Sequence, residues 1–215
     1  MIGCRRVAGE VAPQLSLTHA DRAVLLLADA VGHGIGPALA VTEVRAMLRM
    51  AIRAGESLST IIRHLNAQLC ADLSEGRFVT MWLAELDVDA GTVTGFICGQ
   101  GPLLHFRRAA GTCDVVETDA VPLGLLEDMD VRMREPTRLE AGDVFVALSD
   151  GIVDAQNAQG EAFGTKRVID LITENQAVSA SGLLAALRDA LTTYTEGKPP
   201  EDDRTVIIVK CTRSR

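Results

Sequence analysis

The run LLLADAVGHGIG, from Leu25 to Gly36, is the stretch that best indicates the fold. An apolar stretch ends at Asp29, a glycine-rich loop holding His33 follows, and a helical pattern begins at Pro37. A strand that delivers one carboxylate at its end is a common way to place a ligand rigidly. The run therefore predicts a buried strand, a tight loop and a helix, with Asp29 as the candidate ligand.

Two later stretches also place an aspartate beside an apolar run. Residues 144–151 read VFVALSDG, with Asp150 at the end of the apolar run, and the pair Asp202-Asp203 stands just before TVIIV at 205–209. An aspartate at a strand end is most often a turn or cap residue, and that interpretation stays open for each one alone. Together they predict a shared site for hard cations such as Mg²⁺ or Mn²⁺, which prefer oxygen ligands.

Composition favours one domain over residues 1–215 and excludes two classes of partner. The chain has 215 residues, 47% hydrophobic, with a net charge of −8 and no basic stripe that would indicate nucleic acid. No apolar run approaches the roughly 18 residues of a membrane helix.

The five cysteines are scattered without a CxxC pair, which favours reduced thiols in a cytoplasmic protein. Cys98 and Cys211 are expected to be buried in strands.

Periodicity predicts an α+β chain. Helical spacing predicts helices at Gly36–Arg53, Leu58–Leu73, Lys166–Glu174 and Ser181–Tyr194, capped in two cases by Ser57 and Ser181. Met47 and Met50 are expected to widen the apolar face of the first helix. Strands, including a meander in the middle of the chain, are predicted at Val7–Val11, Ala23–Ala28, Phe78–Leu86, Thr92–Cys98, Leu103–Arg107, Cys113–Thr118, Val131–Leu139, Val144–Ser149 and Thr205–Cys211. Residues 151–164 are expected to be a polar loop.

These motifs resemble a known family. The bacterial phosphatases of the metal-dependent PPM (PP2C-like) superfamily, in the branch of SpoIIE and RsbU, carry D-V-S-G-H-G after a strand, where this chain has DAVGHG from Asp29 to Gly34. Further landmarks follow in family order: Leu65-Asn66, Phe78-Val79-Thr80, Pro122-Leu123-Gly124, Ala141-Gly142-Asp143, SDGIVDA at 149–155, Phe163-Gly164 and Asp202-Asp203-Arg204-Thr205. The resemblance runs from about Val7 to Lys210.

The resemblance implies a four-layer α-β-β-α sandwich of two mainly antiparallel sheets flanked by helices, with two Mn²⁺ or Mg²⁺ ions at one edge. By this resemblance Asp29 bridges the ions and Ala30 offers its backbone carbonyl. Asp150 and Asp202 complete the protein ligands, with Asp203 as the alternative to Asp202. His33 is a candidate general acid for the leaving seryl oxygen, although a histidine that only fixes the loop is an open alternative.

Two of the chain's departures from the family pattern bear on the predicted site. The family usually has an aspartate where this chain has Glu10, which keeps the charge but is one methylene longer. The family's A-G-H-N-P-P becomes CGQGP, with Gln100 in place of the histidine. We expect the first change to affect metal occupancy and the second to affect local hydrogen bonding more than the chemistry. His19, His64 and His105 are expected to be structural or solvent-facing.

The sequence thus predicts a metal-dependent protein serine/threonine phosphatase that uses a metal-activated water. The resemblance implies a phosphorylated bacterial regulatory protein as substrate, such as a STAS-type anti-sigma-factor antagonist, with a sensor domain or partner for regulation. A homodimer is left open. Two alternatives also remain: a phosphatase-like module that docks a partner without turnover, motivated by Glu10, and a hydrolase for a small phosphorylated metabolite.

Overall fold

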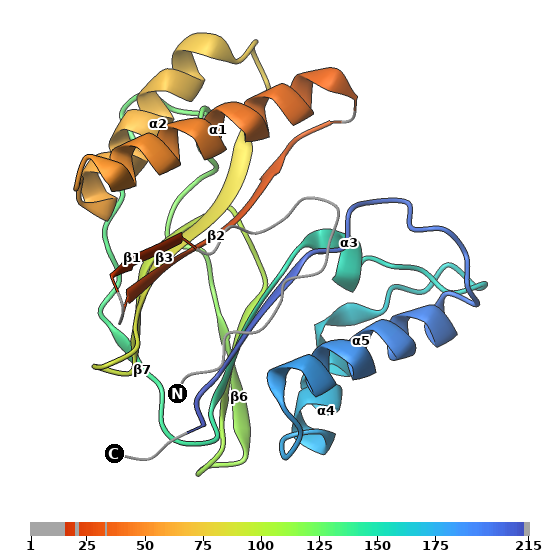
Figure 1. Ribbon diagram of the computed structural model, residues 1–215. Coiled ribbons are helices and arrows are strands. Elements are labelled where there is room, and N and C mark those ends of the chain that lie inside the picture. Colours follow the sequence, from red (N-terminus) through yellow and green to blue (C-terminus); the bar gives the residue numbers. More distant parts are fainter. Residues whose placement is uncertain (1–15, 20–21, 33, 213–215) are drawn as a thin grey trace. The chain divides into compact units, whose positions relative to one another are not determined.

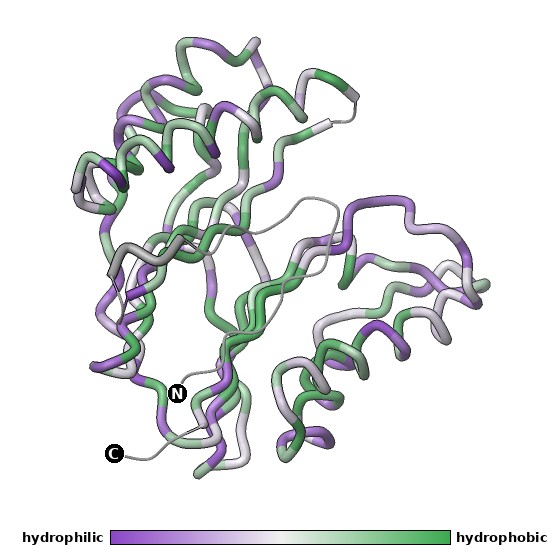
Figure 2. The backbone as a smooth tube through the Cα atoms, viewed as in Figure 1, coloured by the Kyte–Doolittle hydropathy of each residue, from purple (hydrophilic) through white to green (hydrophobic). Residues whose placement is uncertain are grey.

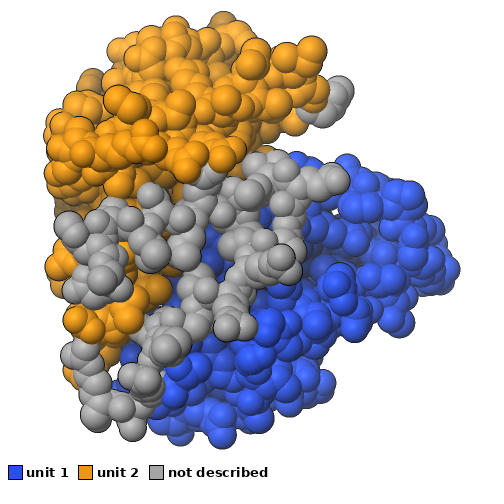
Figure 3. All heavy atoms as spheres, viewed as in Figure 1, with its two compact units in different colours: residues 1–13, 101–117, 139–215 blue, residues 14–100, 118–138 orange. Residues whose placement is uncertain are grey.

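Two antiparallel β-sheets with helices account for the regular structure of the described part of the chain (Figure 1). The computed structural model describes residues 16–19, 22–32 and 34–212. The chain divides into two compact units, shown in Figure 3: unit 1 comprises residues 1–13, 101–117 and 139–215, and unit 2 comprises residues 14–100 and 118–138. One domain over 1–215 stays a prediction.

Unit 2 is built on a five-stranded antiparallel sheet in the order β1-β2-β3-β4-β7. Its strands are β1 (Ser16–His19), β2 (Arg22–Ala30), β3 (Val79–Asp87), β4 (Thr92–Cys98) and β7 (Thr137–Arg138). β2 pairs with β3 along its whole length, from Arg22 opposite Asp87 to Ala30 opposite Val79. Because β2 lies inside the sheet, its almost continuous apolar run from Ala23 to Leu27 is buried.

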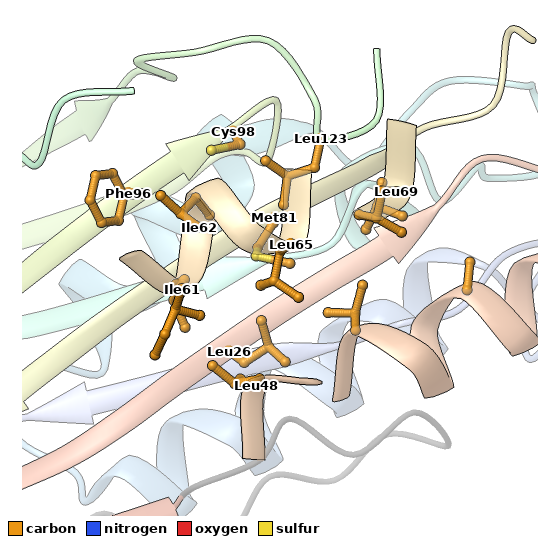
Figure 4. Packing of buried hydrophobic residues seen from close by; sticks show 14 of the residues in the cluster. Leu26, Leu48, Ile61, Ile62, Leu65, Leu69, Met81, Phe96, Cys98 and Leu123 are labelled. Atoms are coloured by element: carbon orange, nitrogen blue, oxygen red, sulfur yellow. The ribbon is translucent and has the colours of Figure 1, made fainter. Parts of the chain in front are cut away.

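Helices α1 (Ile35–Arg53) and α2 (Leu58–Asp72) lie on one face of this sheet (Figure 1). Their apolar residues meet those of the strands in one core, in which Leu26, Leu48, Ile61 and Met81 are buried (Figure 4). Full burial of one such side chain contributes about 1.5–3 kcal/mol. Ser57 caps α2, as the sequence predicted, by accepting a 3.2 Å hydrogen bond from the Thr60 amide.

Unit 1 is built on a four-stranded antiparallel sheet in the order β6-β5-β8-β9. Its elements are β5 (Leu103–Arg107), β6 (Thr112–Val116), β8 (Val144–Leu148), β9 (Val206–Lys210), α3 (Asp150–Val153), α4 (Gly164–Glu174) and α5 (Ala180–Tyr194). Strands β5, β8 and β9 are mostly hydrophobic, whereas α4 and α5 mix hydrophobic and hydrophilic residues, as Figure 2 shows. The apolar sides of α4 and α5 join the strands in a second core, represented by Phe106, Val146, Ile172 and Leu187.

Most predicted elements are confirmed within a few residues. The predicted strands Thr92–Cys98 and Leu103–Arg107 match β4 and β5 at both ends, and the helices match α1, α2, α4 and α5 closely. Cys98 and Cys211 are buried, and no disulfide joins the four described cysteines to one another. The predicted strand Val7–Val11 lies outside the described residues. Among the described helices, none is long and apolar enough to cross a bilayer.

Five expectations about elements are wrong. The run Val131–Leu139 contributes only the two-residue β7, and residues 150–153 form the short helix α3 rather than loop. Met50 is 64% exposed. The cap of α5 is Ser179, not Ser181, because the Ser179 hydroxyl accepts the Gly182 amide. The meander is divided, since the β3–β4 hairpin and the β5–β6 hairpin belong to different sheets.

Candidate metal centre

Asp150 is placed by the end of β8, the central strand that pairs with both β5 and β9. The buried run of β8 ends at Leu148, and the chain turns at Ser149 into α3, where Asp150 is the first residue. The Asp150 side chain is exposed, and its Oδ1 accepts a 2.9 Å hydrogen bond from the Gly151 amide. The strand therefore delivers a solvent-accessible carboxylate at a fixed point.

Ser149 ties the segment that carries Asp202 to this strand end. Ser149 is 5% exposed, and its hydroxyl donates to the Asp203 carbonyl at 2.9 Å while accepting the Thr205 amide at 2.8 Å. Its own amide donates to the Thr205 carbonyl at 2.9 Å. Hydrogen bonds of this kind hold a loop in one place because breaking them would leave buried polar groups unpaired. Asp202 is thus fixed next to the start of α3.

Gly151 allows the two segments to approach more closely than any side chain would permit. A Cβ atom at this position would lie 2.3 Å from the Asp203 carbonyl oxygen and 3.2 Å from the Asp202 carbonyl carbon. Both neighbours are backbone atoms, so a rotamer change could not relieve the overlap. The glycine after Asp150 is therefore required by the packing of this loop on the Asp202-Asp203 backbone.

The result is a pair of exposed carboxylates within unit 1. One oxygen of Asp150 and one of Asp202 lie within 4.8 Å of each other. Two oxygens on one octahedral Mg²⁺ at ~2.1 Å each are about 3–4.2 Å apart, so a separation of this order suits a hard cation. The backbone carbonyl of Asp203 accepts the hydrogen bond from the Ser149 hydroxyl.

Asp29 lies in unit 2, one residue from the end of β2, and is partly buried. It stands opposite Thr80 of β3, whose hydroxyl lies 3.3 Å from the Asp29 carbonyl oxygen and 3.0 Å from Oε1 of Gln100. Gln100 is 5% exposed. Ala30 is buried and pairs with Val79, so the strand end that precedes the glycine loop is held by the sheet.

Two predicted site residues, His33 and Glu10, lie outside the described residues. Of the other histidines, His64 is exposed on α2, and the side chain of His19 is not described. His105 is structural: it is 1% exposed in β5, and its Nε2 lies 3.3 Å from Oδ2 of Asp143. Asp143 also accepts the amides of Arg108 and Glu140, at 2.8 Å and 2.9 Å.

The roles of four residues at the site could not be predicted from the motifs that contain them: Ser149, Gly151, Thr80 and Gln100. Their contacts depend on chain segments that are distant in sequence, such as 149 with 203–205 and 80 with 100. The sequence does show small or polar residues directly beside a strand-end aspartate. That position alone does not identify the residues that they contact.

Solved structures place this fold in a known class. The SiaA-PP2C domain of Pseudomonas aeruginosa aligns with a TM-score of 0.76 at 22% identity, covering 89% of this chain and 77% of that one. The RsbU and RsbW domains of Rv1364c from Mycobacterium tuberculosis align with a TM-score of 0.75 at 25% identity, covering 97% and 56%. The chain has the PP2C-like α+β fold with two antiparallel sheets and helices, as the sequence predicted.

The family follows from the sequence comparison. The family model described as stage II sporulation protein E (SpoIIE) matches residues 19–212. Phosphoserine phosphatase RsbU of Bacillus subtilis (strain 168) is 24% identical over 186 residues, which are 86% of this chain and 55% of RsbU. The chain belongs to the SpoIIE family of PP2C-like phosphatase domains, and it spans about half the length of RsbU.

Related phosphatases with this fold bind divalent cations. RsbX was solved in complex with magnesium and aligns with a TM-score of 0.64 at 13% identity, covering 95% of this chain and 92% of that one. The catalytic domain of the serine/threonine protein phosphatase PstP was solved with 2 manganese ions and aligns with a TM-score of 0.63 at 17% identity, covering 97% and 98%. Both ions belong to the oxygen-preferring class that the Asp150–Asp202 pair suits.

Proposed function

We propose that this chain is a metal-dependent protein serine/threonine phosphatase. The observation that carries the proposal is the Asp150–Asp202 carboxylate pair, which Ser149 and Gly151 hold together in unit 1. Two like charges kept close and exposed are stabilised by a bound cation. Membership of the SpoIIE family and the magnesium and manganese of related structures support the same site.

The proposed ligands are Asp150, Asp202, Asp29 and the backbone carbonyl of Ala30. Asp202 is favoured over its alternative Asp203 because the Asp202 carboxylate oxygen is the one close to Asp150. Asp29 is proposed as the ligand that the two ions would share, on the family resemblance and on its position one residue from the end of β2. Glu10 is proposed as a further ligand on the family pattern alone.

The chemistry is direct hydrolysis of a phosphate ester. When bound, two Mn²⁺ or Mg²⁺ ions would lower the pKa of a bridging water and offset the charge on the phosphoryl oxygens. The chain's own part is to hold the carboxylates and to position the ester for in-line attack. His33 is proposed to give a proton to the seryl or threonyl oxygen as the phosphorus–oxygen bond breaks.

The proposed substrate is a phosphoserine or phosphothreonine on a bacterial regulatory protein, such as a STAS-type anti-sigma-factor antagonist. It is supported by the relatives named phosphoserine phosphatase, RsbU and RsbP. A cytoplasmic location, regulation by a sensor domain or partner, and a homodimer stay predictions.

The experiment is hydrolysis of p-nitrophenyl phosphate and of a phosphoserine peptide with Mn²⁺, then with excess chelator. We expect activity that needs Mn²⁺ and falls by at least about 10²-fold in Asp150→Asn, since one metal ligand is lost. Asp189→Asn, which alters an exposed aspartate on α5, is the matched control and should keep full activity. If the wild type neither binds nor uses Mn²⁺, the chain is a docking module, and if only metabolites are hydrolysed, it is a metabolite phosphatase.

A further inference from the structure

The buried side-chain amide of Gln100 is linked through Thr80 to the end of β2, the strand that carries Asp29. Gln100 is 5% exposed, and its Oε1 is 3.0 Å from the Thr80 hydroxyl. The same hydroxyl is 3.3 Å from the Asp29 carbonyl oxygen. All three residues belong to unit 2, so this contact chain stands within one compact part of the molecule. A buried glutamine in such a place costs free energy unless its amide is used.

The Thr80 hydroxyl stands between two groups but has only one proton to donate. With Oε1 of Gln100 facing it, that proton is shared between the glutamine and the Asp29 carbonyl. The contact with Oε1 holds the Thr80 side chain in the rotamer that brings its hydroxyl to the Asp29 carbonyl. Gln100 thereby acts on the Asp29 carbonyl through Thr80.

The position of Gln100 is itself fixed by the preceding residue. The Gly99 amide donates to the Ala120 carbonyl and to the Thr118 hydroxyl, both at 2.9 Å. Gly99 has a φ of 72°, and a Cβ there would lie 2.6 Å from Cγ of Pro122. A glycine is therefore required at this turn. The backbone of this turn directs the side-chain amide of Gln100 toward Thr80 of β3.

The Asp29 carbonyl belongs to the planar peptide group that joins Asp29 to Ala30. Fixing that plane limits ψ of Asp29 and φ of Ala30, and so limits the directions open to the next carbonyl, that of Ala30. The ladder gives support on the far side, where the Val31 amide donates to the Phe78 carbonyl at 3.1 Å. The Thr80 hydroxyl thus acts on the peptide that joins the last two residues of β2.

We propose that Gln100 is a positioning residue that acts through Thr80 to orient the Asp29 and Ala30 oxygens toward a bound divalent cation. This inference rests on the proposed metal site. It explains how the chain tolerates glutamine where the family pattern has histidine, because both side chains offer a hydrogen-bond acceptor to the Thr80 hydroxyl. Groups that orient ligands in this way typically change metal affinity or activity by about 10–100-fold when they are removed.

The test is calorimetric titration of Mn²⁺ into the full chain and four variants. Gln100→Leu removes the amide at similar volume, and Thr80→Val removes the hydroxyl. Their matched controls are Gln100→His, which keeps an acceptor for the Thr80 hydroxyl, and Thr80→Ser, which keeps the hydroxyl. We expect the first two to bind Mn²⁺ about tenfold more weakly and the two controls to stay within about threefold of the wild type. The Mn²⁺ concentration at half-maximal phosphatase activity should rise in parallel.

A purely structural role would give a different pattern. It would lower the melting temperature in chelator and leave the Mn²⁺ dissociation constant of the folded protein unchanged. Wild-type affinity in both Gln100→Leu and Thr80→Val would overturn the inference and leave the metal site standing. A wild type that binds no Mn²⁺ would overturn the proposed function and this inference together. If Gln100→Leu does not fold, Thr80→Val and Thr80→Ser decide the question.

Discussion

Gly151→Ala should disable the site without touching any proposed ligand. The added methyl carbon would be 2.3 Å from the Asp203 carbonyl oxygen, 0.7 Å short of the 3.0 Å below which real Cβ contacts essentially do not occur. The obstacle is backbone, so the 202–203 segment and the start of α3 must separate by about that amount or more. A misplacement of about 1 Å in a reacting group can cost ~10²-fold in rate.

We therefore expect kcat/KM for p-nitrophenyl phosphate with Mn²⁺ to fall by about 10²-fold in Gly151→Ala. The free energy of unfolding, measured in urea with chelator present, should fall by about 1–3 kcal/mol because the loop is overpacked. Gly182→Ala on α5 is the matched control, since its Cβ would meet side-chain atoms and no backbone, those of Val178 at 3.1 Å and Ser179 at 3.5 Å. Gly151→Ala with wild-type kcat/KM would refute the argument that this close approach positions Asp150 and Asp202.

Three other predictions concern the scaffold. Asp143→Asn should lower the free energy of unfolding by about 1–3 kcal/mol in urea, because the buried carboxylate that accepts two backbone amides and contacts His105 loses its charge; an unchanged midpoint would contradict this. Ser179→Ala should cost about 1 kcal/mol of helix capping and Ser181→Ala much less, and equal melting temperatures would contradict the assignment. Burial, with a smaller effect of Asp119, raises the pKa of the Cys98 thiol from 9.0 to about 12. The unfolded thiol ionises first, so stability should fall between pH 9 and 12, and alkylation at pH 8 should be slow; fast alkylation of the native protein would contradict it.

Periodicity predicted the elements well where a pattern belongs to one element alone. The apolar run before Asp29 and the helical spacing of Ile61, Ile62, Leu65 and Leu69 are complete within their own segments, and the structure buries those four residues to 1% exposure or less. Such patterns report which side of an element is buried, because that side must exclude water wherever the element packs.

The failures occurred where a decision depends on distant parts of the chain. Both Ser179 and Ser181 suit a helix cap, and only the backbone path selects the first. The hairpins β3–β4 and β5–β6 look alike in sequence, yet β5 pairs with β8 and β4 with β7. The site shows the same limit. The motifs identified Asp150 and Asp202, whereas the roles of Ser149 and Gly151 come from contacts across more than fifty residues.

We propose that Asp29, Asp150 and Asp202 together hold divalent cations. The most direct measurement is anomalous scattering from a crystal of the full chain grown with Mn²⁺. We expect strong manganese peaks bonded to carboxylate oxygens of all three residues, at about 2.2 Å. A structure at saturating Mn²⁺ with no peak at Asp150 and Asp202, or with Asp29 bound to none of the ions, would contradict it.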